Sequence, residues 1–307
     1  MHNIFYSNYG THFNHHDHSP QQYSWFGSDT QKLYDSNIKF FSALPEIAWT
    51  PPSIDYTFNN IGMRVSNDAY YDITDDYDFS DKIVVLGCSQ VLGIGIRYEY
   101  TLGECLSKLF GKQVINWGVG GCGPDAVFHN AMWLATRERL PLKVIILWPQ
   151  PTRFIFDNPE NNNTHYIIPP QNYEDISKYY KRNILDGTVP EFKFKKYKTV
   201  LRNVFKERLY ESFVHCGVPR ITDTGTPIGI DYRTKDDLRY HIKLHQATKD
   251  VTSVSELLKY HYARDIYKLP TNFKNITDFS EFRRGVAAHQ GIIPNKLLAD
   301  NIYGGIN

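Results

Sequence analysis

The sequence predicts an α/β fold of the three-layer α/β/α type, in which helices flank a parallel sheet. Three apolar runs, at residues 82–86, 113–117 and 143–148, have the length and composition of strands buried on both faces. Helical patterns separate these runs, so strand and helix alternate from residue 81 to residue 148. Such alternation indicates parallel strands joined by right-handed crossovers.

The intervening helices carry their own start and stop signals. An apolar stripe at helical spacing, closed by Gly111, predicts the first helix from Leu102, Cys105, Leu106 and Leu109. Pro124 and Asp125 open the second helix directly after the second strand. Near the end of the chain, Pro294 and Gly304 are expected to mark the start and the end of another helix.

Outside this regular core the sequence predicts two accessory regions. Residues 1–78 are polar and weakly periodic, which predicts an N-terminal extension ahead of a domain at 79–307. We expect this arm to pack through Tyr and Phe side chains on its own domain or on another chain, which would make it a contact for a protein assembly partner. Residues 151–280 are expected to form an insertion-like region.

Within that region, residues 197–213 show a fourfold-spaced apolar stripe beside many basic residues. The stripe consists of Tyr197, Leu201, Phe205, Leu209 and Phe213, and it predicts an amphipathic helix. Its basic face is either a solvated surface or a contact for phosphate or membrane.

Composition excludes several classes of partner and cofactor. The chain has 34 basic and 33 acidic residues, so its net charge of +1 gives no reason to expect nucleic acid or an anionic membrane. No apolar run is long enough for a membrane span. The start of the sequence lacks the pattern of a signal peptide, so we expect cytoplasmic synthesis, followed by retention there or by association with a virion.

The cysteines and histidines allow metal or redox chemistry to be considered. None of the four cysteines, Cys88, Cys105, Cys122 and Cys216, forms a CxxC pair, so buried thiols are expected. A histidine cluster around Asp17, made of His12, His15, His16 and His18, is either a metal site or part of a solvated arm. We expect no metal and no cofactor for the function of the chain.

Ser89 is the first candidate for a catalytic residue. The strand at 82–86 leads directly into Gly87-Cys88-Ser89, which places Ser89 just beyond the carboxyl end of a buried strand. Ligands of open α/β sheets bind at this end. A serine in this position can equally cap the helix that follows.

The glycines after the second strand permit a second interpretation. Gly118-x-Gly120-x-x-Gly123 matches the dinucleotide-binding pattern. That pattern also requires an acidic residue near the end of the next strand, whereas this strand ends in Trp148-Pro149-Gln150. The sequence contains no GxxxxGK[ST] motif, which excludes a P-loop.

Taken together, three segments resemble the SGNH (GDSL-type) hydrolases. Gly87-Cys88-Ser89-x-x-x-Gly93 is similar to their first block, Asn116-x-Gly118-x-Gly120-Gly121 to their second, and His289-x-Gly291 to their fifth. The resemblance covers about residues 81–153 and 282–302 and implies a flavodoxin-like parallel sheet. It implies Ser89 as nucleophile, His289 as general base, and the backbone N–H groups of Ser89 and Gly121 as donors to the oxyanion.

Two positions depart from the family pattern. Val286 stands where the family has an aspartate that orients the histidine. A backbone carbonyl, Asp278 or Glu281 would then have to hold the imidazole. The asparagine of the third block is also missing, and Gln150 stands at about its place, either as a substitute oxyanion donor or as a loop residue.

The resemblance implies a serine esterase, with acetyl groups on a carbohydrate as the expected ester. A non-catalytic structural or glycan-binding protein that keeps the fold is the alternative. The segment Tyr56-x-x-Asn59-x-x-Gly62-x-Arg64 resembles a prelude to such domains in some bacterial and phage proteins. A virion or other assembly component is compatible with both functions.

Overall fold

The computed structural model describes part of the chain. The described residues are 5–8, 10–12, 21–27, 30–31, 54–149, 153–158, 163–167, 188–213, 220–221, 227–228 and 292–306. The chain divides into two compact units. The first consists of Met1–Gln22, Thr57–Leu92 and Gly111–Val214, and the second of Tyr23–Tyr56, Gly93–Phe110 and His215–Asn307.

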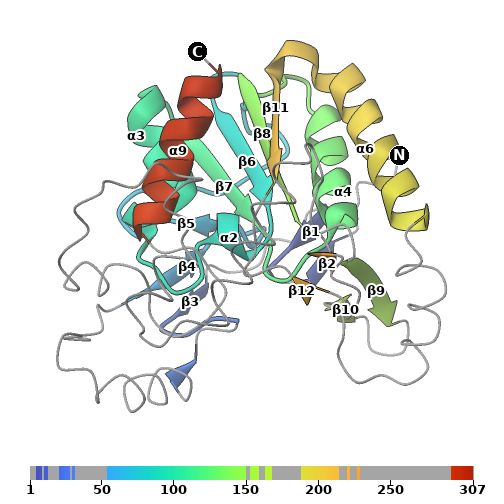
Figure 1. Cartoon of the computed structure of the whole chain (residues 1–307). Coiled ribbons are helices and arrows are strands. Elements are labelled where there is room, and N and C mark those ends of the chain that lie inside the picture. The colour runs from blue at the N-terminus through green and yellow to red at the C-terminus, as the bar shows by residue number, and fades with distance from the viewer. Residues whose placement is uncertain are drawn as a thin grey trace, which may run out of the picture. The chain divides into compact units, whose positions relative to one another are not determined.

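A parallel sheet of four strands forms the centre of the first unit (Figure 1). Its strands are β6 (Ile83–Gly87), β7 (Val114–Gly118), β8 (Lys143–Trp148) and β11 (Leu209–Phe213). Every residue of β6 and β7 is buried, as expected for apolar strands covered on both faces. The three strands that the sequence predicted are confirmed.

The strand order is β11-β8-β6-β7, and each neighbouring pair is parallel. In chain order this is the 2-1-3-4 arrangement of flavodoxin-like sheets, whose switch point lies between the first and third strands. In this chain those strands are β6 and β8. The sheet and its flanking helices confirm the expected three-layer α/β/α class.

Two helices of the first unit lie side by side along the sheet, α4 (Pro124–Ala135) and α6 (Thr188–Phe205) (Figure 1). Pro124 occupies the first turn of α4, as predicted from its fixed φ. The rings of Phe128 and Tyr197 stack between the helices, with centroids 4.1 Å apart. Tyr197 also donates a hydrogen bond of 2.5 Å to Asp125, and burial followed by this carboxylate raises the pKa of the Tyr197 phenol.

The prediction of an amphipathic helix at 197–213 is wrong for residues 206–213. Helix α6 ends at Phe205, a 3₁₀ turn η3 (Lys206–Arg208) follows, and Leu209 begins strand β11. The fourfold spacing does not distinguish a helix from a strand, because residues four apart share a face in both. Residues 188–213, expected in an insertion-like region, therefore supply a helix and an edge strand of the sheet, whereas the division of the chain at residue 79 stays a prediction.

In the second unit, helices α3 (Leu102–Phe110) and α9 (Ile292–Ile306) pack together. The rings of Phe110 and Tyr303 meet edge to face with centroids 4.9 Å apart. Helix α3 is confirmed, and Gly111 follows it with a φ of +59°. Helix α9 begins two residues before Pro294 and continues past Gly304, because an exposed glycine lowers helix propensity without ending a helix.

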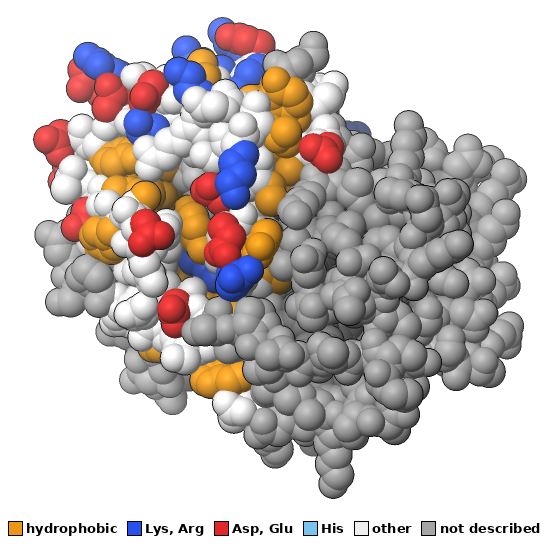
Figure 2. All heavy atoms as spheres, turned by 90° about the vertical axis from the view of Figure 1, so that its left-hand side faces the viewer, with side chains coloured by type: hydrophobic (Ala, Val, Ile, Leu, Met, Phe, Trp, Pro, Cys, Tyr) orange, Lys and Arg blue, Asp and Glu red, His pale blue; other side chains and the backbone are white. Residues whose placement is uncertain are grey.

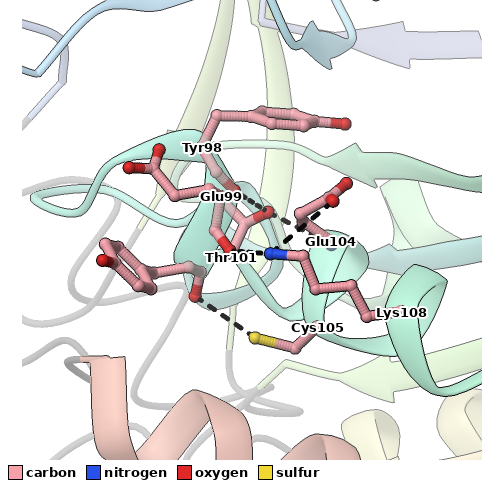
Figure 3. Close-up of polar contacts among 7 residues, drawn as sticks. Tyr98, Glu99, Thr101, Glu104, Cys105 and Lys108 are labelled. Atoms are coloured by element: carbon pink, nitrogen blue, oxygen red, sulfur yellow. Dashed lines mark hydrogen bonds and ion pairs between the residues drawn. The ribbon is translucent and has the colours of Figure 1, made fainter.

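The start of α3 is held by the polar contacts drawn in Figure 3. The Thr101 hydroxyl donates to Tyr98 O at 2.8 Å and accepts the Glu104 N–H at 3.4 Å, which is half of a capping box. Lys108 donates to Glu99 O and lies 3.8 Å from the Glu104 carboxylate. These contacts cap one N–H of the first turn and join Lys108 to the residues before the helix, so they explain the cluster as structural.

The remaining elements are short. Three antiparallel pairs join β1 (Phe5–Ser7) to β2 (Gly10–His12), β9 (Phe154–Asn158) to β10 (Asn163–Ile167), and β12 (Arg220–Ile221) to β13 (Pro227–Ile228). A three-stranded sheet contains β3 (Gln21–Tyr23), β4 (Tyr56–Phe58) and β5 (Arg64–Val65). Helix α2 (Ser89–Leu92) and the 3₁₀ turn η1 (Tyr98–Tyr100) complete the described elements.

Surface charge agrees with the balanced composition. On the face drawn in Figure 2, acidic and basic side chains are interspersed with hydrophobic ones across the described part. No helix among the described residues has the length and apolarity that a membrane crossing requires. In the same part of the chain no group of three or more His, Cys, Asp or Glu could hold a metal ion, and His15, His16 and His18 lie outside it.

Candidate active site

Ser89 lies where β6 ends and α2 begins, at the carboxyl edge of the parallel sheet. The Leu92 N–H donates to Cys88 O at 3.1 Å and closes the turn of α2, so the chain passes directly from the strand into a helical turn. Gly87 is required at the end of β6, because a Cβ there would lie 2.9 Å from Leu147 O on the neighbouring strand. Ser89 itself is only 6% exposed.

A glycine-rich loop follows β7 at the same edge. In the β6–β7 register Gly87 lies opposite Gly118, so Ser89 and Gly121 each follow neighbouring strand ends by a few residues. The Cys122 N–H donates to Val119 O at 3.3 Å, and Gly121 has a φ of +74°. A four-residue turn with positive φ at its third residue is of type II, which explains the glycine at this position. The Gly121 N–H takes no part in the closing hydrogen bond of such a turn.

Asn116 joins β7 to α2. Its Nδ2 donates to Val91 O at 2.8 Å, and its Oδ1 accepts the Gly118 N–H at 3.1 Å. The side chain is completely buried. Gly118 allows α2 to approach this closely, since a Cβ there would lie 2.6 Å from the Cα of Leu92. The asparagine and glycine of this segment therefore position the helix that begins with Ser89.

The segment from Tyr56 to Arg64 supports the other end of α2. Asn59 Oδ1 accepts the Met63 N–H at 2.9 Å in a tight turn whose Gly62 has a φ of +75°. The turn leads into Arg64, which is fully buried and donates from Nη1 to Leu92 O at 3.1 Å. A cation at the last residue of α2 complements the partial negative charge of that helix end.

The N-terminal arm reaches the same loop through Asn8. Its Nδ2 donates to Gly62 O at 2.9 Å and to Gly118 O at 3.0 Å, and its Oδ1 accepts the Gly120 N–H at 3.0 Å. Nearby, Tyr6 exchanges two hydrogen bonds with the buried Asn130 of α4. Sequence reasoning missed Asn8, because a single asparagine in a polar arm has no pattern to distinguish it.

The close approach of backbone segments accounts for two of the three glycines that match the dinucleotide pattern. Gly118 lies against α2, and a Cβ on Gly123 would lie 2.7 Å from the carbonyl carbon of Arg153. Gly121 is required by its positive φ. Packing therefore explains Gly118 and Gly123 without a phosphate ligand, and turn geometry explains Gly121, which is outside the pattern.

The cysteines beside the site are structural. Cys88 and Cys122 are buried cysteines that form no disulfide, and the Cys122 S–H donates to Gly87 O at 3.5 Å. Burial, followed by the neighbouring Cys88, raises the pKa of the Cys122 thiol well above its ordinary value. The Cys122 thiol therefore stays protonated at neutral pH and is a poor nucleophile.

The structure brings together two of the four predicted site residues. Ser89 and Gly121 lie at one edge of the sheet, after neighbouring strands. Gln150 and His289 lie outside the described residues, as do Asp278, Glu281 and Val286. The roles of His289 and Gln150, and the distance from Ser89 Oγ to the imidazole, stay predictions.

Comparison with known proteins gives a structural likeness and no sequence match. No protein-family model matches the chain. No curated protein matches it either. Among solved structures it is similar to a candidate GDSL-like lipase from Bacteroides ovatus, with 18% identity over 68% of this chain and 69% of the other, at a TM-score of 0.25. A TM-score this low assigns no role to any residue of this chain.

Proposed function

We propose that the chain is a serine esterase of the SGNH type that removes acyl groups, with acetyl esters of carbohydrates as its substrate class. The observation that supports this most directly is the placement of Ser89 and the Gly121 turn at the carboxyl edge of the sheet. This edge is where ligands bind in open α/β folds, and Ser89 follows a strand of the switch point.

The reaction we propose has two steps. Ser89 Oγ attacks the ester carbonyl carbon while its proton passes to the imidazole of His289, and the negative oxygen is stabilised by the N–H groups of Ser89 and Gly121. The intermediate collapses, the C–O bond breaks, and the alcohol leaves with the proton from the imidazole. Water then attacks the acyl-serine by the same route and releases the acid.

The fixed geometry around α2 supports this assignment over a simple helix-capping serine. Asn116, Gly118 and Arg64 all position a helix of a single turn. A helix this short gains little stability of its own, since most helical stability comes from length and packing. An oxyanion site needs donors fixed in advance, and these contacts hold the helical turn that begins with Ser89 through Val91 and Leu92.

The first experiment measures hydrolysis of p-nitrophenyl acetate and of acetylated oligosaccharides by wild type, Ser89→Ala and Ser66→Ala. Wild type and Ser66→Ala should hydrolyse an ester at the same rate, and Ser89→Ala should not. Labelling with a fluorophosphonate, followed by peptide mass spectrometry, should place the adduct on Ser89. Ser66 is a matched control because it is a serine of the same unit whose Oγ accepts a local backbone N–H, that of Asp68.

Val286 sets the expected size of the activity. Loss of the acid that orients the histidine can lower a rate about 10⁴-fold, so the wild-type rate should be low and Val286→Asp should raise it. No adduct on Ser89, together with no hydrolysis above the Ser89→Ala variant on either substrate, would instead support a non-catalytic structural or glycan-binding protein.

A further inference from the structure

We propose that Asn8 is a positioning residue for the oxyanion site, fixing the loop that carries the Gly121 N–H. This inference rests on the proposed esterase function. The N-terminal arm then contributes to the active site itself. Asn8 contacts no reacting atom in this proposal and acts through the backbone of Gly118 and Gly120.

The hydrogen bonds of the loop show which of its peptide groups Asn8 and the turn hold in place. The peptide group between Gly118 and Val119 is held at both ends, because its carbonyl accepts from Asn8 Nδ2 and its N–H donates to Gly87 O at 2.9 Å. The next peptide group is also held at both ends, since Val119 O accepts the Cys122 N–H and the Gly120 N–H donates to Asn8 Oδ1. The following peptide group carries the Gly121 N–H, and it lies between the peptide group that Asn8 holds and the Cys122 N–H that closes the turn.

Only a carboxamide can make this set of contacts. The side chain faces two carbonyl oxygens and one N–H, so it must offer donors on one atom and an acceptor on the other. The opposite orientation of the amide would place Oδ1 against both carbonyls. Asn8 also ties the loop to Gly62, in the turn that precedes the buried Arg64. Asn8 thus contacts both the glycine loop and the turn that leads to Arg64, the residue that bonds the end of α2.

The same loop contains little else that could hold it. Two glycines, Gly120 and Gly121, lie in its turn and have no side chains to pack. Glycine has the largest backbone freedom of any residue, so the turn depends on its hydrogen bonds. Removing the Asn8 carboxamide leaves the Gly120 N–H and the Gly118 carbonyl without this partner, and the Gly121 N–H becomes free to rotate away from the oxyanion position.

The test compares Asn8→Ala, Asn8→Asp and Asn60→Ala with wild type, using p-nitrophenyl acetate as substrate. Asn60 is the matched control, because it is a buried asparagine of the same unit whose side chain exchanges two hydrogen bonds of 2.9 Å with the backbone of Ile73. Asn8→Ala should lower kcat about 10- to 100-fold with KM within about twofold, somewhat less than direct loss of an oxyanion donor. Asn60→Ala should lower stability and leave kcat unchanged.

The pH profile of Asn8→Asp separates positioning from a general loss of stability. In this variant the introduced carboxyl group must be protonated to donate to Gly118 O while it accepts the Gly120 N–H, because an ionised carboxylate has no donor. The rate of Asn8→Asp relative to wild type should therefore rise as pH falls. This variant also serves as the test if Asn8→Ala does not fold.

The outcomes are distinguishable. A Ser89-dependent wild-type activity that both Asn8 variants retain within about twofold would overturn the role of Asn8 and leave the esterase function standing. An equal fall of kcat in Asn60→Ala would also overturn it, since stability alone would explain the loss. Wild-type activity no higher than that of Ser89→Ala would overturn the esterase function and the role of Asn8 with it.

Discussion

The two ends of the parallel sheet use polar residues in opposite ways. At the carboxyl end, the contacts run from the neutral side chains of Asn8 and Asn116, and from the buried Arg64, to backbone groups. At the amino end the polar contacts include surface ion pairs, such as Arg139 with Asp78 at 3.0 Å and the half-buried Lys82 with Asp81 at 2.9 Å. One sheet therefore has a rigid, buried polar end and a solvated, charged one.

This difference indicates which end of the sheet has the more tightly constrained geometry. Exposed ion pairs contribute little, because water and salt screen them and two long side chains lose freedom. A buried amide that bonds two backbone groups is costly to remove, since its partners are left unpaired away from water. Mutations at the carboxyl end should therefore cost far more than mutations at the amino end.

The largest effect is expected from Gly118→Ala. The added Cβ would lie 2.6 Å from Leu92 Cα and 2.7 Å from the Val91 carbonyl carbon, so α2 has to move. We expect a loss of about 3 kcal/mol or more in the free energy of unfolding, because backbone atoms cannot move aside as a side chain can. Chemical denaturation measures this change.

Gly304→Ala is the matched control for that experiment. Gly304 is exposed in α9, and no atom lies within 4 Å of a Cβ built there. The alanine should stabilise the protein by about 0.5–1 kcal/mol through helix propensity. Equal effects of the two substitutions would show that contact with α2 does not determine the need for glycine at 118.

A smaller loss is expected from Asn116→Leu. The leucine keeps the approximate volume but leaves Val91 O and the Gly118 N–H without their asparagine partner in the interior. Each such group costs about 1–3 kcal/mol, which urea denaturation should resolve.

Arg139→Ala provides the comparison at the amino end. This substitution removes an exposed ion pair, and the free energy of unfolding of the variant should equal that of the wild type within experimental error. If Arg139→Ala were more destabilising than Asn116→Leu, the contrast between the ends of the sheet would be wrong.

A further effect is confined to alkaline pH and concerns Tyr77 at the amino end. Burial, followed by the charge of Asp81, raises the pKa of Tyr77 to about 12 from its ordinary value of 10.0. The fold thus favours the protonated phenol, so its contribution to stability is complete below about pH 10 and is lost as pH rises toward about 12. Stability measured over this range should fall less steeply in Tyr77→Phe, and an unchanged slope would contradict the shift.

Much of the fold could be predicted from the sequence because its signals are local. The apolar runs at β6, β7 and β8, Pro124 at the start of α4 and Gly111 after α3 each act through the residue itself or its immediate neighbours. Strand β11 was missed because the stripe that contains Leu209 and Phe213 fits a helix and a strand equally well.

The site was predictable only in part, for a related reason. Ser89 and Gly121 could be found because each follows a strand and lies in a recognisable block. Asn8 could not be found, since its contacts are with residues 62, 118 and 120, which no local pattern connects to it. Likewise, Arg64 was noted as part of a motif, but its contact with the last residue of α2 follows only from the tertiary structure.

The bonds of Asn8 also set the order in which the site can assemble. Its partners lie 54, 110 and 112 residues along the chain, so the arm cannot engage the glycine loop during synthesis until β7 has left the ribosome. Contacts of such sequence separation form slowly, because a long loop must close before they contribute stability. Asn8 can therefore hold the glycine loop only after both β6 and β7 have been synthesised, so this contact depends on a long-range closure of the chain and not on local structure.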